Sequence, residues 1–247
     1  MTVLCTGYEP FGDHDENPSA MVAERLDGRT VAGHDVVGRV LPVEFDGLRE
    51  ELASLLDEHD PDAVIGMGLA GGRASVAVER VGINVADAVT VPDNAEADPE
   101  NERVDAAGPD AYLATLPVVD AVEALLDAGI PARVSNTAGT HCCNNHLYTT
   151  HRLLEERGEL VTDDGDDAGD TGDGDGGGDR DGYSGGDHVG DGVPAGFVHL
   201  PLTPAMAAGD AVDDNAHRGG GVSPSMAVAL QVVAVEGVVE TTLGRLE

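Results

Sequence analysis

Apolar positions along the chain follow two patterns, continuous apolar runs and helical spacing, which alternate from the first residues onwards. Continuous apolar runs that end in glycine-containing turns, as in TVLCTGYEPFG (residues 2–12) and AVIGMGLAGGR (63–73), are typical of buried strands. Between them, FDGLREELASLLDEHDPD (45–62) carries leucines at helical spacing on one face. Segments of these two kinds follow one another over nearly the whole sequence, which favours an α/β protein.

The same patterns place strands and helices along the chain. The strands are expected within residues 2–12, 34–45, 63–73, 74–88, 130–139 and 195–204, and the helices within residues 17–28, 45–62, 109–129, 143–159 and 221–243. Pro18 suits the first turn of its helix, and Ser223 and Pro224 suit the N-cap and the first position of the last helix. Strands that alternate with helices of about 10 to 15 residues predict a three-layer α/β/α sandwich around a mostly parallel sheet.

Residues 163–192 differ from the rest of the chain in composition. Of these 30 residues, 11 are aspartate and 12 are glycine, so the segment has almost nothing with which to build a core. We expect a single domain over residues 1–247, interrupted by this segment as a disordered acidic insertion on the surface. The aspartates resemble calcium loops, but the nonapeptide repeat and the EF-hand spacing are missing, which favours loose cation attraction over specific calcium binding.

The charge balance is strongly negative, with 13 arginines, no lysine and 47 acidic residues giving a net charge of −34. A chain with this charge repels itself, and the repulsion is weakened where molar salt reduces the Debye length to about 3 Å. We therefore expect a protein from an extreme halophile with molar salt in its cytoplasm. Nucleic acid is not expected as a partner, because phosphate binding needs clustered arginine and lysine.

The cysteines and the N-terminus bear on the compartment. The three cysteines, Cys5, Cys142 and Cys143, do not make a disulfide framework. The opening MTVLCTGYEPFG has no charged segment followed by a long apolar run, so it does not resemble a signal peptide. No stretch approaches the roughly 20 apolar residues of a membrane span. The expectation is a soluble, cytoplasmic protein with reduced thiols and no membrane partner.

The stretch SNTAGTHCCNNHLYTTHR (residues 135–152) holds the densest candidate chemistry. Cys143, His146 and His151 could bind zinc, but the chain has no second cysteine pair, and a spacing of five residues puts the two histidines on different faces of a helix. A cysteine at a helix start is alternatively a nucleophile, because the dipole stabilises the thiolate and free N–H groups bind an oxyanion. A small buried apolar side chain is the third interpretation. The residues alone leave all three open and favour the last.

Several segments together resemble a known family. SNTAGTHCCNNHLY is similar to the cysteine signature of pyroglutamyl peptidase I, and alignment from Ser135 puts the nucleophile at Cys143. GLAGGRASVAVERVGIN resembles the glutamate signature, with the acid at Glu79, and GFVHLP resembles the histidine segment, with the base at His199. TGYEPFG, NPS, VPDNA and PSM match shorter family segments in the same order. The similarity covers the chain apart from the acidic insertion.

The resemblance implies a cytosolic cysteine peptidase with an α/β/α fold that removes N-terminal pyroglutamyl residues from peptides without a metal or cofactor. Cys143 would attack the pyroglutamyl carbonyl to form a thioester, His199 would act as base and then as acid, and Glu79 would orient the imidazole. Backbone N–H groups at the helix start would stabilise the oxyanion. Tyr8 and Phe11 would lie against the lactam ring. The family often forms tetramers, so a homotetramer is the assembly to test.

The chain also departs from the family pattern. Leu69 occupies a further substrate-binding position, where the family commonly has Gln. A contact made through the backbone would survive this change. Tyr8 replaces a Phe of the family, and Val89 replaces an Arg. The missing Arg motivates an alternative, an inactive relative that binds pyroglutamyl or other small lactam ligands without turnover. A zinc-binding stress or assembly module built on residues 141–151 is a third hypothesis. The remaining histidines are bystanders in the peptidase interpretation: His141, His146, His151, His188 and His217.

Overall fold

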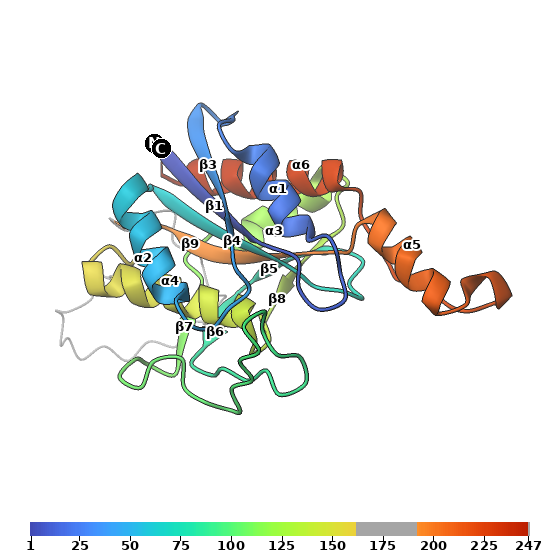
Figure 1. The fold of residues 1–247 in the computed structure, drawn as a ribbon. Coiled ribbons are helices and arrows are strands. Elements are labelled where there is room, and N and C mark those ends of the chain that lie inside the picture. The colour runs from blue at the N-terminus through green and yellow to red at the C-terminus, as the bar shows by residue number, and fades with distance from the viewer. Residues whose placement is uncertain (162–191, 247) are drawn as a thin grey trace, which may run out of the picture.

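A seven-stranded sheet forms the centre of the computed structural model, which describes residues 1–161 and 192–246 (Figure 1). From one edge to the other its strands are β2 (Thr30–Val31), β3 (His34–Leu41), β1 (Thr2–Tyr8), β4 (Ala63–Leu69), β9 (Ala195–Leu200), β5 (Val76–Glu79) and β8 (Ala132–Ser135). A separate small sheet pairs β6 (Val81–Ile83) with β7 (Ala111–Leu113).

Most neighbouring strands of the large sheet are parallel, as the sequence predicts. β1 pairs in parallel with both β3 and β4, β4 with β9, and β5 with β8. β2 runs antiparallel to β3, and β5 runs antiparallel to β9. The second reversal matters for function, because it sets side chains near the end of β9 beside those of β5.

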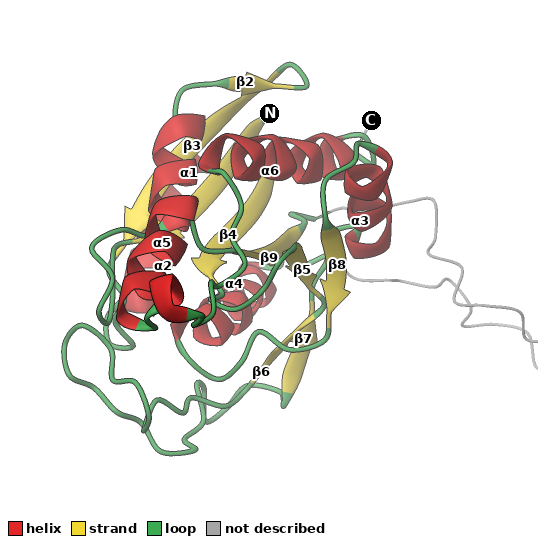
Figure 2. Cartoon of the chain, turned by 90° about the vertical axis from the view of Figure 1, so that its right-hand side faces the viewer, coloured by secondary structure: helices red, strands yellow, loops and turns green. Residues whose placement is uncertain are grey.

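Helices cover both faces of the sheet, which confirms the expected three-layer architecture (Figures 1 and 2). One face carries α1 (Pro18–Leu26), α3 (Val118–Asp127) and α6 (Val228–Leu243), and the other carries α2 (Leu48–His59) and α4 (Cys142–Arg157). The first layer buries a cluster rich in valine, and the second buries one rich in leucine. α5 (Pro204–Asp213) projects from one end of the molecule and leads into the 3-10 turn η1 (Ala216–Arg218) (Figure 1).

Local sequence signals explain where two of the predicted helices begin and end. α1 follows Asn17, whose side chain accepts a hydrogen bond from the backbone N–H of Ser19, and Pro18 occupies the first turn. α4 ends at Gly158, whose φ of 71° is the left-handed conformation that glycine adopts without strain. These boundaries are therefore readable from single residues.

The last helix begins later than the sequence predicts. Ser223 and Pro224 do not start it, and α6 begins only after residue 227. Ser225 instead pairs with Leu202 in a parallel bridge, and the backbone N–H of Met226 donates to the Leu202 carbonyl at 2.9 Å. This extended pairing occupies backbone groups that a helix would need, so a tertiary contact overrides the local capping signal.

Other segments also differ from the expectation. Residues 74–88, predicted as one strand, form β5 and β6, which belong to different sheets. α5 is an additional helix, and its start signals are local: the Thr203 side chain accepts from the N–H of Met206 at 3.1 Å, and Pro204 is the first residue. Periodicity misses α5 because so few of its side chains are buried.

The predicted disordered insertion, residues 163–192, lies outside the described residues except for Gly192. Within the described ranges, none of the helices combines the length and the apolar character that crossing a bilayer requires. The sheet and its two helical layers form the framework that carries the candidate site.

The close packing of α1 on β3 depends on Gly38. An ideal Cβ at this position would overlap the backbone carbonyl of Ala23 in α1. Gly38→Ala should therefore lower the free energy of unfolding by about 1–3 kcal/mol, the usual range for overpacking, as measured by denaturant unfolding in molar KCl. Gly209→Ala, in open space within α5, is the control and should be neutral or stabilise by up to about 1 kcal/mol. An unchanged midpoint for Gly38→Ala would contradict this tight packing.

Candidate active site

The carboxyl ends of three parallel strands, β1, β4 and β9, place Tyr8, Gly68 and His199 at one edge of the sheet. Gly68 is opposite His199 in the register of β4 and β9, and Ala77 of β5 is opposite His199 on its other side. Side chains alternate along a strand, so Glu79, two residues after Ala77, points to the same face as His199. The fold thus makes these two residues diagonal neighbours.

Glu79 and His199 form a buried ion pair. The Nδ1–H of His199 donates to Glu79 Oε1 across 2.7 Å, and the two side chains are 5% (His199) and 0% (Glu79) exposed. Arg73, in the loop after β4, donates from Nη1 to the same oxygen at 2.9 Å. Glu79 Oε2 is buried and has no hydrogen-bond partner among the described residues, and the Ser135 hydroxyl donates to the Thr137 carbonyl. One carboxylate oxygen therefore carries both cationic contacts.

The protonation states follow from these contacts. Burial by itself pushes the pKa of His199 down, but Cys143 and Glu79 outweigh burial and raise that pKa to about 9. Burial pushes the pKa of Glu79 up, yet its hydrogen bond and charge interaction with His199, assisted by the Ser135 hydroxyl and then by Arg73, hold it below its ordinary value. At neutral pH the imidazole is therefore protonated and the carboxylate is ionised.

The two adjacent cysteines lie in different surroundings. Cys142 is 1% exposed and packs in the leucine-rich cluster, and burial raises the pKa of its thiol. Cys143 is only partly buried, and a Cβ on Gly68 would come within 2.6 Å of its Sγ, so this thiol lies directly over β4. Gly68 is also the register partner of His199, whose pKa responds to Cys143. Cys143 is therefore the thiol that faces the imidazole.

Asn144 fixes the first turn of α4 to the small sheet. Its Oδ1 accepts from the N–H of Ile83 at 2.9 Å, and its Nδ2 donates to the carbonyls of Ile83 at 2.8 Å and Val85 at 2.9 Å. The side chain is fully buried, so the three bonds are sheltered from water. This clamp gives Cys143, the preceding residue, a defined position.

A second buried chain of hydrogen bonds ties the same turn to β1. The Tyr8 hydroxyl donates to the Cys142 carbonyl at 3.2 Å and lies 3.1 Å from His146 Nδ1, while Thr6 Oγ1 lies 3.2 Å from His146 Nε2. The hydroxyl has one proton, so His146 Nδ1–H donates to the Tyr8 oxygen and Nε2 accepts from Thr6. Burial lowers the pKa of His146 to about 3, which agrees with this neutral ring. Tyr8 is thus 2% exposed, with its hydroxyl committed to α4.

The other two residues predicted to bind substrate share one apolar cluster. Phe11 and Leu69 pack with Met206 and Ala207 of α5. Leu69 is 9% exposed, whereas Phe11 is partly buried and also borders the leucine-rich cluster that Cys143 contacts. Phe11 therefore lies between the base of α5 and the start of α4.

His141 is a residue of this site that the sequence analysis misses. Its ring stacks on Phe11, with centroids 6.2 Å apart and planes at 25°, and meets Phe45 edge-on at 5.1 Å. Its Nε2–H donates to the Val91 carbonyl at 2.9 Å, because a carbonyl can only accept. A signal exists in the sequence: His141 lies two residues before Cys143, where the resembled signature has an aromatic ring.

The histidines considered for zinc do not converge. His151 is fully buried, with Nδ1 2.8 Å from the Leu147 carbonyl, and both ring nitrogens of His146 are held by the hydrogen bonds to β1. In the parts of the chain that the structure describes, no group of three or more His, Cys, Asp or Glu side chains is arranged to hold a metal ion. His217 lies in η1, and His188 falls outside the described residues.

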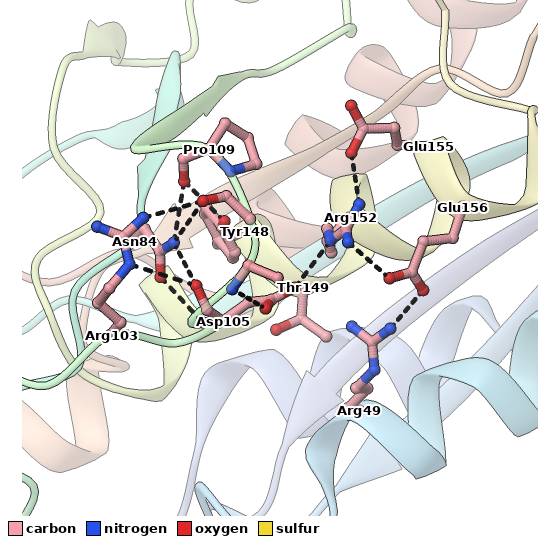
Figure 3. A network of polar contacts seen from close by, with 12 residues as sticks. Arg49, Asn84, Arg103, Asp105, Pro109, Tyr148, Thr149, Arg152, Glu155 and Glu156 are labelled. Carbon is pink, nitrogen blue, oxygen red and sulfur yellow. Dashed lines mark hydrogen bonds and ion pairs between the residues drawn. The ribbon is translucent and has the colours of Figure 1, made fainter.

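A cluster of charged side chains braces α4 further along its length (Figure 3). Arg152 pairs with Asp105 and Glu155, each at 2.8 Å, and with Glu156 at 3.1 Å, and Arg49 of α2 bonds Glu156 as well. The cluster joins α2, α4 and the loop that carries Asp105. Because its cations are already paired with carboxylates, it serves to hold these elements together.

Comparison with known proteins identifies the family of this chain. The family model for pyroglutamyl peptidase matches residues 1–163. Pyrrolidone-carboxylate peptidase 1 of Ralstonia nicotianae is 38% identical over 246 residues, which cover 100% of this chain and 94% of the relative. Pyrrolidone-carboxylate peptidase of Thermococcus onnurineus is 49% identical over 158 residues, which cover 64% of this chain and 78% of the relative.

Solved structures agree with the sequence matches. The pyrrolidone carboxyl peptidase of Thermococcus litoralis superimposes with a TM-score of 0.80 at 32% identity, covering 99% of this chain and 94% of the other. A mutant pyrrolidone carboxyl peptidase from P. furiosus gives a TM-score of 0.81 at 32% identity and covers 100% of both chains. The chain therefore belongs to the pyroglutamyl peptidase family.

Proposed function

We propose that Cys143, His199 and Glu79 are the catalytic triad with which this chain removes N-terminal pyroglutamyl residues from peptides. Family membership gives the reaction: the chain is a pyroglutamyl peptidase, a cysteine-type hydrolase. The observation that carries the residue assignment is the buried hydrogen bond from His199 to Glu79 at 2.7 Å, beside the partly exposed Cys143.

In the first half-reaction, the Cys143 thiolate attacks the pyroglutamyl carbonyl carbon. The protonated imidazole of His199 stabilises the ionised sulfur, and Glu79 holds the imidazole through its Nδ1–H. An S–C bond forms and the C–N bond to the next residue breaks, while the departing nitrogen takes the proton from His199 Nε2. The products are a thioester on Cys143 and a shortened peptide with a free amino terminus.

In the second half-reaction, water hydrolyses the thioester. His199, now neutral, takes one proton from the water as the water oxygen attacks the thioester carbonyl. The C–S bond breaks and 5-oxoproline leaves as the free acid. The imidazolium and the Cys143 thiolate are thereby restored.

The first turn of α4 is suited to hold the oxyanion that forms in both steps. The N–H groups at a helix start have no partner within the helix and carry the positive end of its dipole. We assign the backbone N–H of Cys143 to this role. Val89, which stands where the family has an arginine, is 53% exposed. An oxyanion site made of backbone N–H groups does not need a cation from that position.

The pyroglutamyl ring is flat and uncharged, so an apolar wall with aromatic faces suits it. We assign this wall to Phe11, Leu69 and Tyr8, with His141 as an additional member. Phe11 and His141 stack on each other at the start of α4, and both are partly accessible. Tyr8 supports this wall from the interior, because it is almost fully buried and its hydroxyl donates to the Cys142 carbonyl.

Three further proposals concern the salt environment, the domain organisation and the assembly of the chain. The net charge of −34 and the lack of lysine support a halophilic enzyme working in a cytoplasm of molar salt. The chain is assigned to one domain, residues 1–247, interrupted by residues 163–192. A homotetramer is the proposed assembly, and α5 with the segment after it, which exposes Val212 and Val222, projects from the body and offers a surface for it (Figure 1).

Replacing the nucleophile tests the triad directly. Cys143→Ala should lower hydrolysis of a pyroglutamyl fluorogenic amide in molar KCl by at least about 10³-fold, since losing one triad member removes most of the catalysis. Cys142→Ala deletes the adjacent thiol and is the matched control, which should keep at least roughly half of the activity. Activity that survives in Cys143→Ala would overturn the assignment. An inactive but folded wild type would favour the binding-only alternative.

Phe11→Ala tests the pocket. Loss of an aromatic wall should remove about 1–2 kcal/mol of binding, so KM for the same amide should rise roughly 5- to 30-fold while kcat changes less. Val119→Ala, at an exposed position on α3, is the control and should leave both constants unchanged. An unaltered KM in Phe11→Ala would remove this residue from the pocket.

Salt should stabilise the fold. Raising KCl from 0.1 M to 2 M shortens the Debye length from about 10 Å to roughly 2 Å, so the repulsion among the carboxylates weakens. The Tm measured by circular dichroism should rise by roughly 5–15 °C, which corresponds to a few kcal/mol. NaCl at the same ionic strength should act similarly, because screening does not depend on the cation. A constant or falling Tm would contradict the halophilic assignment.

A further inference from the structure

The glycine-rich loop after β4 brings a cation to the buried end of the triad. We propose that Arg73 is a positioning residue whose charge keeps Glu79 ionised in the acyl-enzyme, and that it therefore supports hydrolysis of the thioester more than its formation. This inference rests on the triad assigned above.

The contact joins a sheltered cation to a fully buried anion. Arg73 Nη1 and His199 Nδ1 both donate to Glu79 Oε1, at 2.9 Å and 2.7 Å. Glu79 is 0% exposed, and within the described ranges its Oε2 has no hydrogen-bond partner. The Arg73 side chain is 25% exposed, so water screens its charge only in part.

Apart from His199 and Arg73, no described group around Glu79 supplies a positive charge. β9 contributes His199, α4 contributes Cys143, and β8 contributes the neutral hydroxyl of Ser135. α3, which packs on the opposite face of β5, presents apolar side chains to the sheet. Arg80, the next residue along the chain, donates to a surface amide instead. Glu79 is therefore balanced by the contacts to His199 and Arg73.

The charges of Arg73 and of the three triad side chains change during turnover. Before the attack they alternate, with Arg73 positive, Glu79 negative, His199 positive and Cys143 negative. When His199 gives its proton to the leaving nitrogen and Cys143 becomes a thioester, two of the four charges disappear. The Glu79 carboxylate is then left with Arg73 as its cation, in a place where an unpaired buried charge is strongly unfavourable.

Without Arg73, the acyl-enzyme would relieve this imbalance by taking up a proton on Glu79. A protonated Glu79 could not stabilise the imidazolium that forms when His199 accepts a proton from water, so deacylation would slow. Acylation would be less affected, because Glu79 begins that step paired with protonated His199. Higher pH would ionise Glu79 again and restore deacylation.

Arg73→Gln tests this with the pyroglutamyl fluorogenic amide in molar KCl. At pH 7, kcat should fall by about 10-fold or more, while kcat/KM, which reflects acylation, should fall by less than about 3-fold. Rapid mixing should show a burst of product, and mass spectrometry of the quenched enzyme should find the pyroglutamyl group on Cys143. The acidic limb of the kcat–pH profile should move up by about one pH unit or more, so that kcat approaches the wild-type value at high pH.

Two further variants separate charge from structure. Arg73→Lys keeps the positive charge and should retain most of the wild-type kcat. Arg133→Gln removes an exposed arginine from β8, the strand beside β5, and is the matched control for loss of one charge. It should leave kcat, the absence of a burst and the pH profile as in the wild type. Circular dichroism and Tm should show that every variant is folded.

Equal losses of kcat and kcat/KM in Arg73→Gln, with no burst and an unchanged pH limb, would overturn the proposal and leave Arg73 as a structural contact. The same kcat split in Arg133→Gln would also overturn it, because general loss of charge would then explain the result. Failure of the triad itself has a different signature: Cys143→Ala would stay active.

Discussion

One buried carboxylate constrains the architecture of the site. Glu79 is fully buried, and the two groups that balance its charge come from different elements, His199 from β9 and Arg73 from the loop after β4. The antiparallel register of β5 and β9 makes Glu79 and His199 diagonal neighbours. A slip of one residue would turn Glu79 to the opposite face, into the valine-rich cluster, where a buried carboxylate has no partner. Chemistry and strand register are therefore fixed together.

In the part of the chain that the structure describes, the helix that carries Cys143 begins without a side-chain cap, as α2, α3 and α6 also do. α1 and α5 are capped by the side chains of Asn17 and Thr203, whereas among the described residues no side chain caps the N-terminus of α4. Tertiary ties replace the cap: Asn144 bonds the small sheet, and Tyr8 bonds the Cys142 carbonyl. The first turn is thus held in place while its N–H groups stay available for a developing negative charge.

The sequence predicts the sheet and the helical layers well, because buried strands and helix faces require apolar residues at regular intervals. It fails where long-range pairing competes with local signals, as when Ser225 pairs with Leu202 and delays α6. For the site, local patterns left every residue with an ordinary alternative, and only the resemblance of several segments assembled a triad. Arg73 was missed because its partner is set by register and loop path, which no spacing along the chain encodes. His141 was missed although it stands at the aromatic position of the resembled signature.

The neighbouring cysteines also determine how this enzyme responds to oxidants. Successive residues on a helix point about 100° apart, so Cys142 faces the core while Cys143 faces the imidazole. A partly exposed thiol is open to conversion to a sulfenic acid, which an adjacent thiol can reduce by forming a disulfide. Here the adjacent sulfur could resolve it only if the first turn of α4 unwound. Reduction of an oxidised Cys143 would therefore fall to small thiols outside the protein rather than to its neighbour.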